Sequence, residues 1–269
     1  MKIGPDNAPT SAICTSNPET IIVRGHDLVN DLVGKISFTD HIWLLVAGTL
    51  PSEAQRTVLD STLVAIAEHG LVPSVVASRM TLAAAPEALQ GAVAAGILGC
   101  GSVILGASAN AGLFFNEVLQ AQEAGSGLDD AVRETVGKYR AVKRAIPGYG
   151  HPLHKGHDPR AHRLIEVCKE AGLAGRCIEI AWAVDRLLPE ITGRSLALNV
   201  SGAIPAVLLD AGYPLLALKG VPILARTASL VGHLLEEQTH AIGFIMAGAG
   251  SAAITYDGPA PDGFVPDEN

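Results

Sequence analysis

The sequence predicts an all-α fold, and three observations support this prediction. Apolar residues make up 48% of the 269 residues but aromatic residues only 4%, so most apolar side chains are small or aliphatic and suit closely packed helices. Apolar residues recur at helical spacing along most of the chain. No segment alternates β-branched and polar residues for long enough to build a large sheet. A chain of this length forms one large domain or two unequal lobes.

Capping and helix-breaking residues set the expected ends of the elements. Ser52 can cap the helix that follows it, and Gly70 ends that helix, which leaves His69 at its C-terminal end. Residues 1–17 are expected to be irregular, and 20–25 to form a short strand. The expected helices cover residues 38–47, 52–68, 73–85, a segment from Pro86, 128–145, 158–171, 176–188, 196–211 with an interruption at Pro205, 222–237 and 241–253. The tail, residues 256–269, is rich in Pro, Gly and Asp, which predicts disorder.

Charge and cysteine content exclude several classes of function. The formal net charge is −8, with no basic run and no interleaving of aromatic and basic residues, so we expect no nucleic acid partner and no membrane partner. The four cysteines form no Cys-x-x-Cys pair and are expected to be reduced thiols. Because the N-terminal residues lack the apolar stretch of a signal peptide, we expect a cytoplasmic protein.

One segment, residues 91–115, carries no charged side chain and approaches the length of a membrane span. Gly96, Gly99, Gly101 and Gly106 break it, and it is rich in Ala and Ser. Such small residues let helices approach closely, so we expect helices of a soluble core or of a subunit interface here.

The residues richest in chemistry lie between Pro147 and Arg160. A glycine-rich turn is followed by His151, His154, Lys155 and His157, in a chain with few charges elsewhere. Glycine lets backbone approach a ligand closely, and a histidine exchanges protons near neutral pH. Asp158 and Pro159 suit a helix start, which places Arg160 beside the turn. This pattern predicts acid/base chemistry on an anionic substrate.

Three other patterns bear on function. The three loop histidines also allow a metal site, although no nearby Cys or Glu completes a ligand set. Arg226 is the only charged residue between Gly220 and His233, so it is either an end-of-helix arginine or a buried cation that needs an anion. Ser108 and Ser201 lie outside any Gly-x-Ser-x-Gly motif. Phosphate-binding and dinucleotide-binding glycine motifs are missing, which disfavours nucleotide hydrolysis and nicotinamide redox chemistry.

The string Gly-Tyr-Gly-His at 148–151, followed by Asp-Pro-Arg at 158–160, resembles the signature of the citrate synthase superfamily. Further similar strings are Ile22–Gly25, Leu45–Pro51, Glu68–Gly70, Asn199–Gly202 and Leu224–Arg226. The short chain, the form of the histidine loop and the string at 232–238 look like citryl-CoA lyases in particular, which resemble the C-terminal module of ATP-citrate lyase. The resemblance covers roughly residues 18–250.

This resemblance implies a citrate synthase-like fold with two lobes and a homodimer or higher even oligomer. The large helical domain would hold residues 18–145 and 221–255, and the small domain residues 146–220. The family makes or breaks the carbon–carbon bond between the acetyl carbon of a CoA thioester and the keto carbon of oxaloacetate. The implied ligands are therefore a CoA thioester and a di- or tricarboxylate. Coenzyme A enters as part of the substrate, and no tightly bound cofactor or metal is expected.

The resemblance also implies roles for individual residues of this chain. His151 matches the histidine that hydrogen-bonds the keto or hydroxyl oxygen of the substrate, and His69 matches the second active-site histidine. Arg160 and Arg226 match arginines that bind substrate carboxylates, a task that suits a planar bidentate donor. The turn whose backbone lies against the adenine of CoA matches Ile146, Pro147, Gly148, Tyr149 and Gly150.

The chain departs from the family pattern at three places. Ser201 stands where the family usually has the aspartate that exchanges a proton with the acetyl carbon. Ala109 lies near the position of a histidine that the synthases carry and the lyases lack, which favours a lyase. His240 replaces an arginine of lyase-like chains. The sequence therefore predicts a citryl-CoA lyase, with two alternatives: a catalytically impaired CoA-ester-binding homologue, or a citrate synthase-like condensing enzyme with a different substrate.

Overall fold

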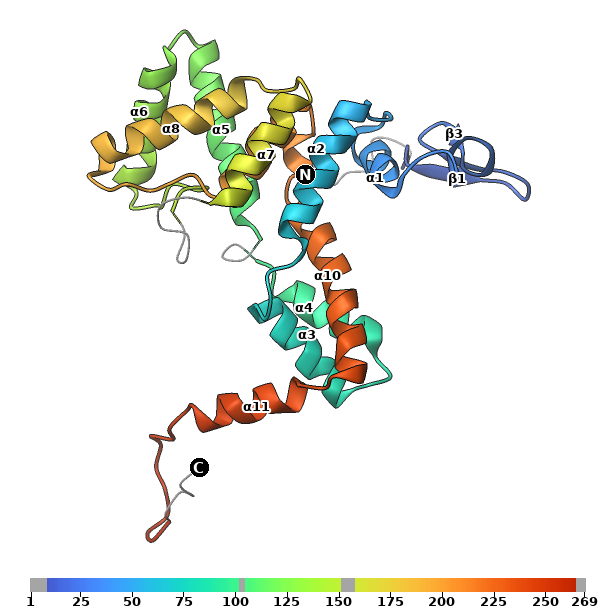
Figure 1. The fold of residues 1–269 in the computed structure, drawn as a ribbon, viewed down its shortest axis with the longest axis vertical. Coiled ribbons are helices and arrows are strands. Elements are labelled where there is room, and N and C mark those ends of the chain that lie inside the picture. The colour runs from blue at the N-terminus through green and yellow to red at the C-terminus, as the bar shows by residue number, and fades with distance from the viewer. Residues whose placement is uncertain (1–8, 102–104, 151–157, 265–269) are drawn as a thin grey trace. The chain divides into compact units, whose positions relative to one another are not determined.

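The computed structural model describes residues 9–101, 105–150 and 158–264 (Figure 1). They form a mainly helical structure with one small sheet, which confirms the predicted all-α class. Two compact units divide the chain. Unit 1 holds the described residues of Met1–Ala65 and Ala107–Val221, and unit 2 holds those of Ile66–Gly106 and Pro222–Asn269. His151, His154, Lys155 and His157 lie outside the described residues.

The N-terminal part of unit 1 contains a three-stranded antiparallel sheet. Its strands are β1 (Cys14–Ser16), β2 (Ile21–Val23) and β3 (His26–Asp27), in the order β1-β2-β3. β2 confirms the strand expected at residues 20–25. The expectation that residues 1–17 are irregular was wrong for β1, because three residues carry no readable periodicity and their strand geometry comes from pairing with β2.

Short helices follow the sheet. A π-helical turn, η1 (Leu28–Leu32), begins at Asp27, and its Leu32 packs with buried residues of β2 and of α1 (Phe38–Ala47). Ser37 and Asp40 form a reciprocal cap at the start of α1. α2 (Glu53–Ala67) is held to α1 by the ion pair of Arg56 with Asp40. Both helices lie where the sequence predicts them.

Five helices form the main core of unit 1: α5 (Ala107–Glu123), α6 (Leu128–Ala141), α7 (Pro159–Glu170), α8 (Arg176–Thr192) and α9 (Val200–Asp210). α5, α7 and α8 all pack against α9, and α6 packs against α5 and α8 (Figure 1). Because α9 is surrounded, it is apolar on all sides. The expected interruption at Pro205 was wrong: α9 continues through this proline, since packing on three sides offsets the one missing backbone hydrogen bond.

Unit 2 is built from α3 (Pro73–Ala84), α4 (Leu89–Leu98), most of α10 (Gly220–Thr239) and α11 (Gly243–Ala252). Leu82, Ala92 and Leu234 form a buried cluster that joins α3, α4 and α10. Arg79 is 2% exposed and pairs with Glu237 at 2.6 Å, and Glu237 also accepts backbone N–H groups at the start of α11. One buried ion pair therefore joins α3, the end of α10 and the start of α11.

The apolar segment at 91–115 is divided, because α4 ends at Leu98 and α5 begins at Ala107. Within the described ranges, one helical stretch, Leu215–Thr239, has the length and composition of a possible membrane span, a test that core helices of soluble proteins also pass. This stretch includes the short 3₁₀ turn η2 (Leu215–Ala217) and α10.

α5 and α6, from the predicted large domain at residues 18–145, pack against α8 and α9, from the predicted small domain at residues 146–220. The lobe boundaries, including residues 221–255, stay a prediction, as does disorder of residues 256–269.

Candidate active site

The predicted site residues fall in both units. Unit 1 contains the turn from Ile146 to Gly150, Arg160 and Ser201, and unit 2 contains His69 and Arg226. His151 lies outside the described residues.

In unit 1 the glycine-rich turn lies directly against the first turn of α9. A Cβ added at Gly148 would come within 2.6 Å of the Gly202 Cα, and one added at Gly202 would come within 2.7 Å of the Gly148 carbonyl oxygen. Gly148 also has φ +87°, which side chains disfavour. Only glycine at both positions lets these backbones approach so closely.

Hydrogen bonds fix this turn to the segment before α9. Gly150 N donates to Ala197 O at 2.8 Å, and Asn199 N donates to Gly148 O at 3.0 Å. The Asn199 side chain donates to Gly150 O at 2.5 Å, while its carbonyl oxygen accepts from Ser201 N at the start of α9. Asn199 is thus a site residue that the sequence identified only as part of a motif.

The side chains of Ile146 and Tyr149 are buried in unit 1. Tyr149 Oη donates to Ala181 O at 2.8 Å, and burial raises the pKa of Tyr149 well above its ordinary value of 10. These two side chains anchor the turn. The predicted contact of residues 146–150 with CoA therefore concerns the backbone rather than these side chains.

Asp158 connects Arg160 with α9. It is 1% exposed and caps α7 as expected; it also accepts Arg160 Nη2 at 3.0 Å and Val200 N at 2.9 Å. Burial of Asp158 opposes its ionisation, but the hydrogen bonds from Arg160 and Val200 outweigh this, and its pKa is lowered from 3.8. Sequence reasoning found the cap but missed the ion pair. The Asp-Pro-Arg spacing brings both side chains to the first turn of α7 and is the signal for this pair.

Ser201 occupies the second position of α9, partly buried beside the turn at 146–150. Pro205 lacks an N–H group, so the Ser201 carbonyl loses the helical hydrogen bond that residue 205 normally donates. The structure thus brings Ser201, Arg160 and the glycine-rich turn together around Asn199 and Asp158.

Arg226 in unit 2 is a buried cation. It is 4% exposed, and its Nε and Nη1 atoms have no hydrogen-bond partner among the described residues. Burial raises the pKa of the neighbouring Cys100 thiol, and the charge of Arg226 opposes that rise. An unpaired buried guanidinium is costly, so this geometry favours a bound anion. Of the two interpretations of Arg226 from sequence, the buried one is correct.

His69 follows the C-terminal end of α2, as expected, and its ring is exposed. Its backbone N–H donates to Glu68 Oε1 at 2.9 Å. No sequence signal singled out Glu68 beyond its place beside His69.

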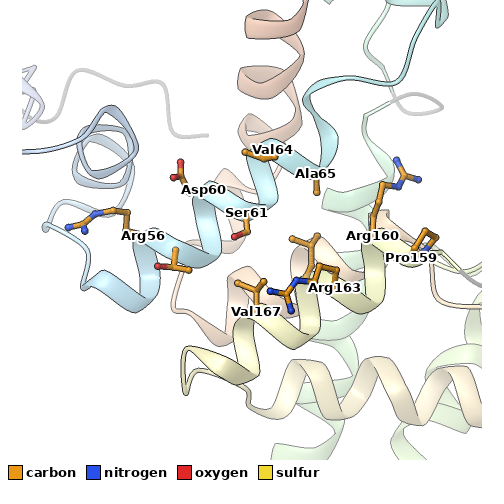
Figure 2. Close-up of a pocket in the computed structure, with 11 residues that line it drawn as sticks. Arg56, Asp60, Ser61, Val64, Ala65, Pro159, Arg160, Arg163 and Val167 are labelled. Carbon is orange, nitrogen blue, oxygen red and sulfur yellow. The ribbon is translucent and has the colours of Figure 1, made fainter.

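A separate pocket of about 650 Å³ lies between α2 and α7 of unit 1 (Figure 2). Its apolar walls include Val64, Leu164 and Val167. Of the predicted site residues that the structure describes, Arg160 alone lines it, and Figure 2 shows this side chain pointing away from the space between the helices. Arg163, which also lines it, pairs with Glu170 at 2.9 Å. Neither His69 nor Ser201, the predicted catalytic residues that the structure describes, lines this pocket.

Metal ligation is untested for the three loop histidines, which lie outside the described residues. Elsewhere in the described part of the chain, no group of three or more His, Cys, Asp or Glu side chains is arranged to hold a metal ion.

The fold and these motifs define a citrate synthase-like all-α protein. A family model described as "Citrate synthase, C-terminal domain" matches residues 53–245. The chain therefore belongs to the citrate synthase family, which confirms the resemblance seen in the sequence.

Known proteins similar to this chain include synthases and lyases. The citrate/2-methylcitrate synthase of Bacillus subtilis (strain 168) is 25% identical over 76% of this chain and 54% of its own length. A solved citryl-CoA lyase from Hydrogenobacter thermophilus is 31% identical with a TM-score of 0.84, over 96% of this chain and 98% of the lyase chain. The ATP citrate lyase from Methanothrix soehngenii, solved with citrate and coenzyme A, is 23% identical with a TM-score of 0.73, over 98% of this chain and 44% of that chain, and shows the fold alone. The chain spans about half the length of the curated synthases it matches.

Proposed function

We propose that this protein is a cytoplasmic carbon–carbon lyase that cleaves citryl-CoA, or a related 3-hydroxy-3-carboxyacyl-CoA, to acetyl-CoA and oxaloacetate. The observation that carries this proposal is Arg226, a buried guanidinium with two unpartnered nitrogen atoms among the described residues, in a family whose members act on carboxylates. A substrate carboxylate supplies the anion that this cation requires. The similarity to nearly the whole of a citryl-CoA lyase chain supports a lyase over a synthase.

The chemistry divides among the site residues as follows. A base takes the proton of the tertiary hydroxyl group, and oxaloacetate leaves as the carbon–carbon bond breaks. The departing acetyl-CoA enolate needs stabilisation and then a proton. We assign His151 and His69 to the oxygen atoms that change charge, and Arg160 and Arg226 to carboxylate binding, which aligns the breaking bond.

Arg160 is partly committed already, because Asp158 accepts from its Nε and Nη2 atoms. In this proposal Arg160 binds the substrate through its remaining Nη1 atom, while Arg226 provides the stronger carboxylate contact. The backbone of residues 146–150 binds coenzyme A as part of the substrate, and the reaction needs no tightly bound cofactor.

The activity test is direct. Purified protein is mixed with citryl-CoA, and oxaloacetate is followed by coupling to malate dehydrogenase. We expect turnover, and an R226A variant should lose about 10- to 100-fold in kcat/KM because a charge-assisted hydrogen-bonded contact is removed. R133A is the matched control, since Arg133 is half exposed and pairs with the exposed Glu190. Equal effects of R226A and R133A would contradict the role of Arg226.

A second function has one observation in its favour. Ser201 replaces the family aspartate that moves a proton at the acetyl carbon, and a hydroxyl is a poor acid or base near neutral pH. A CoA-ester-binding homologue without turnover would bind citryl-CoA in calorimetry and yet give no oxaloacetate. That outcome would replace the lyase proposal.

A further inference from the structure

We propose that Glu68, Ser229 and His233 are positioning residues. They fix the turn that carries His69 against α10, the helix that also carries Arg226. This inference rests on the proposed function, in which His69 and Arg226 contact the substrate. All the residues involved belong to unit 2.

The carboxylate of Glu68 lies within hydrogen-bond distance of four donor groups. Its Oε1 atom accepts the backbone N–H of His69 at 2.9 Å and that of Gly70 at 2.5 Å. Its Oε2 atom accepts Ser229 Oγ at 2.5 Å and pairs with His233 Nε2 at 2.9 Å. One oxygen therefore binds the turn after α2, and the other binds α10.

The spacing on α10 places this contact next to Arg226. Arg226, Ser229 and His233 stand at i, i+3 and i+7, which is one face of a helix. Ser229 lies about 4.5 Å along the helix axis from Arg226, at 1.5 Å per residue. By binding Ser229 and His233, Glu68 links the backbone of His69 to the face of α10 that also carries Arg226.

The turn itself needs this restraint. It lies beyond the last residue of α2, and Gly70 adopts a left-handed backbone with φ +71°. The ring of His69 is exposed, so the protein core does not pack around it. Hydrogen bonds of Glu68 to two successive backbone N–H groups orient the peptide planes on both sides of the His69 Cα atom, and thereby orient its side chain.

The ionisation of Glu68 suits this role. Burial opposes its ionisation, but hydrogen bonds from Ser229, His233 and Gly70 outweigh it and lower the pKa from 4.5 to about 2. The carboxylate is thus acceptor-only at neutral pH, and His233 Nε2 carries the proton that it donates. Ser, His and Glu here do not form a nucleophilic triad, because the Nε2 atom of His233 faces Glu68 and not the Ser229 hydroxyl.

The test is a double-mutant cycle with E68Q and H69A, measured as kcat and KM for citryl-CoA. Misplacing a catalytic group by about 1 Å costs on the order of 10²-fold in rate. We expect E68Q to lower kcat about 10- to 100-fold with a KM change below about threefold, and to have no further effect in the H69A background. S229A should show a smaller loss of the same kind. E87Q is the matched control, because Glu87 is an exposed carboxylate of the same unit.

Thermal melting followed by circular dichroism shows whether a variant loses activity because it unfolds or because His69 is misplaced. If E68Q fails to fold, S229A replaces it in the double-mutant cycle with H69A. S229A removes a single hydroxyl group and so disturbs the fold less. Additive losses of E68Q and H69A, or a wild-type kcat in both E68Q and S229A, would overturn the proposal. If the wild type gives no oxaloacetate, the proposed function fails. The Kd of citrate is then measured by calorimetry for the wild type and for the same single and double variants. A wild type that neither cleaves citryl-CoA nor binds citrate overturns both proposals.

Discussion

At the scale of single residues, Ser201 has the largest expected effect on the proposed chemistry. It stands at the start of α9 beside the glycine-rich turn, where the family resemblance implies a carboxylate. A hydroxyl group donates a hydrogen bond but exchanges protons poorly near neutral pH. The start of a helix also favours a negative charge, so we expect the site to tolerate an aspartate.

We therefore expect S201D to raise kcat for citryl-CoA by about 10²-fold, the effect of one restored acid/base group. The coupled oxaloacetate assay measures it, and S201A serves as the control that lacks both the hydroxyl and the carboxylate. An unchanged or lower rate in S201D would show that the serine serves another substrate or another proton route.

A second single residue, Asp158, is expected to make the stability of the protein depend on pH. Its folded-state pKa is lowered, so its contribution to stability is present above the unfolded value of about 3.9 and is lost as the pH falls through the folded value. D158N should cost about 2–3 kcal/mol at pH 7, because Arg160 loses a charged partner. The variant's free energy of unfolding should then fall less steeply than that of the wild type below pH 4.

Urea unfolding at pH 7, 4.5 and 2.5 measures both effects. D130N is the matched control, since Asp130 is exposed in the first turn of α6. If D158N and the wild type lose stability in parallel between pH 4.5 and 2.5, the stabilising role of the Asp158 carboxylate is wrong.

At the scale of elements, the contact between the 146–150 turn and α9 depends on two glycines. G148A places a methyl group within 2.6 Å of the Gly202 Cα atom in a left-handed backbone. We expect a loss of about 3 kcal/mol or more in the free energy of unfolding, from overpacking and backbone strain together. The control is G172A, whose φ of +71° is similar but whose added Cβ meets nothing within 4 Å.

G172A should cost only the backbone strain, about 1–2 kcal/mol. Chemical denaturation compares the two variants. A G148A loss no greater than that of G172A would mean that the turn moves away from α9 at little cost, and that the contact does not fix the site.

The Arg79–Glu237 pair makes a similar prediction for α3, α10 and α11. R79M removes one partner of a pair whose side chains are 2% and 3% exposed, so Glu237 is left buried without a cation. We expect a loss of about 3–5 kcal/mol. R133M breaks the exposed pair with Glu190 and should cost at most about 1 kcal/mol. Thermal or urea unfolding distinguishes them, and equal losses would contradict a structural role for the buried pair.

At the scale of the whole molecule, the candidate residues are divided between the two units, with His69 and Arg226 in one and Arg160 and Ser201 in the other. The family resemblance also implies a homodimer or higher even oligomer. We therefore expect sedimentation velocity to give a mass of at least twice 27.8 kDa. A monomer at all concentrations would contradict this part of the proposal.

The sequence by itself determined the helical class, the ends of most helices and the family. Caps, glycines and helical periodicity are local, so the helices expected at residues 38–47, 52–68 and 158–171 could be predicted from neighbouring residues alone. The motif of residues 148–160 is likewise local in the chain. These features need no knowledge of what packs against them.

Tertiary structure decided the rest, because it depends on partners far apart in the chain. β1 exists through pairing with β2, and α9 continues through Pro205 because three helices enclose it. The Asp158 contact with Val200 joins residues 42 apart, and the Glu68 contact with His233 joins residues 165 apart. Whether Arg226 is a surface cation or a buried one also follows from packing, and packing left it without a protein acceptor among the described residues.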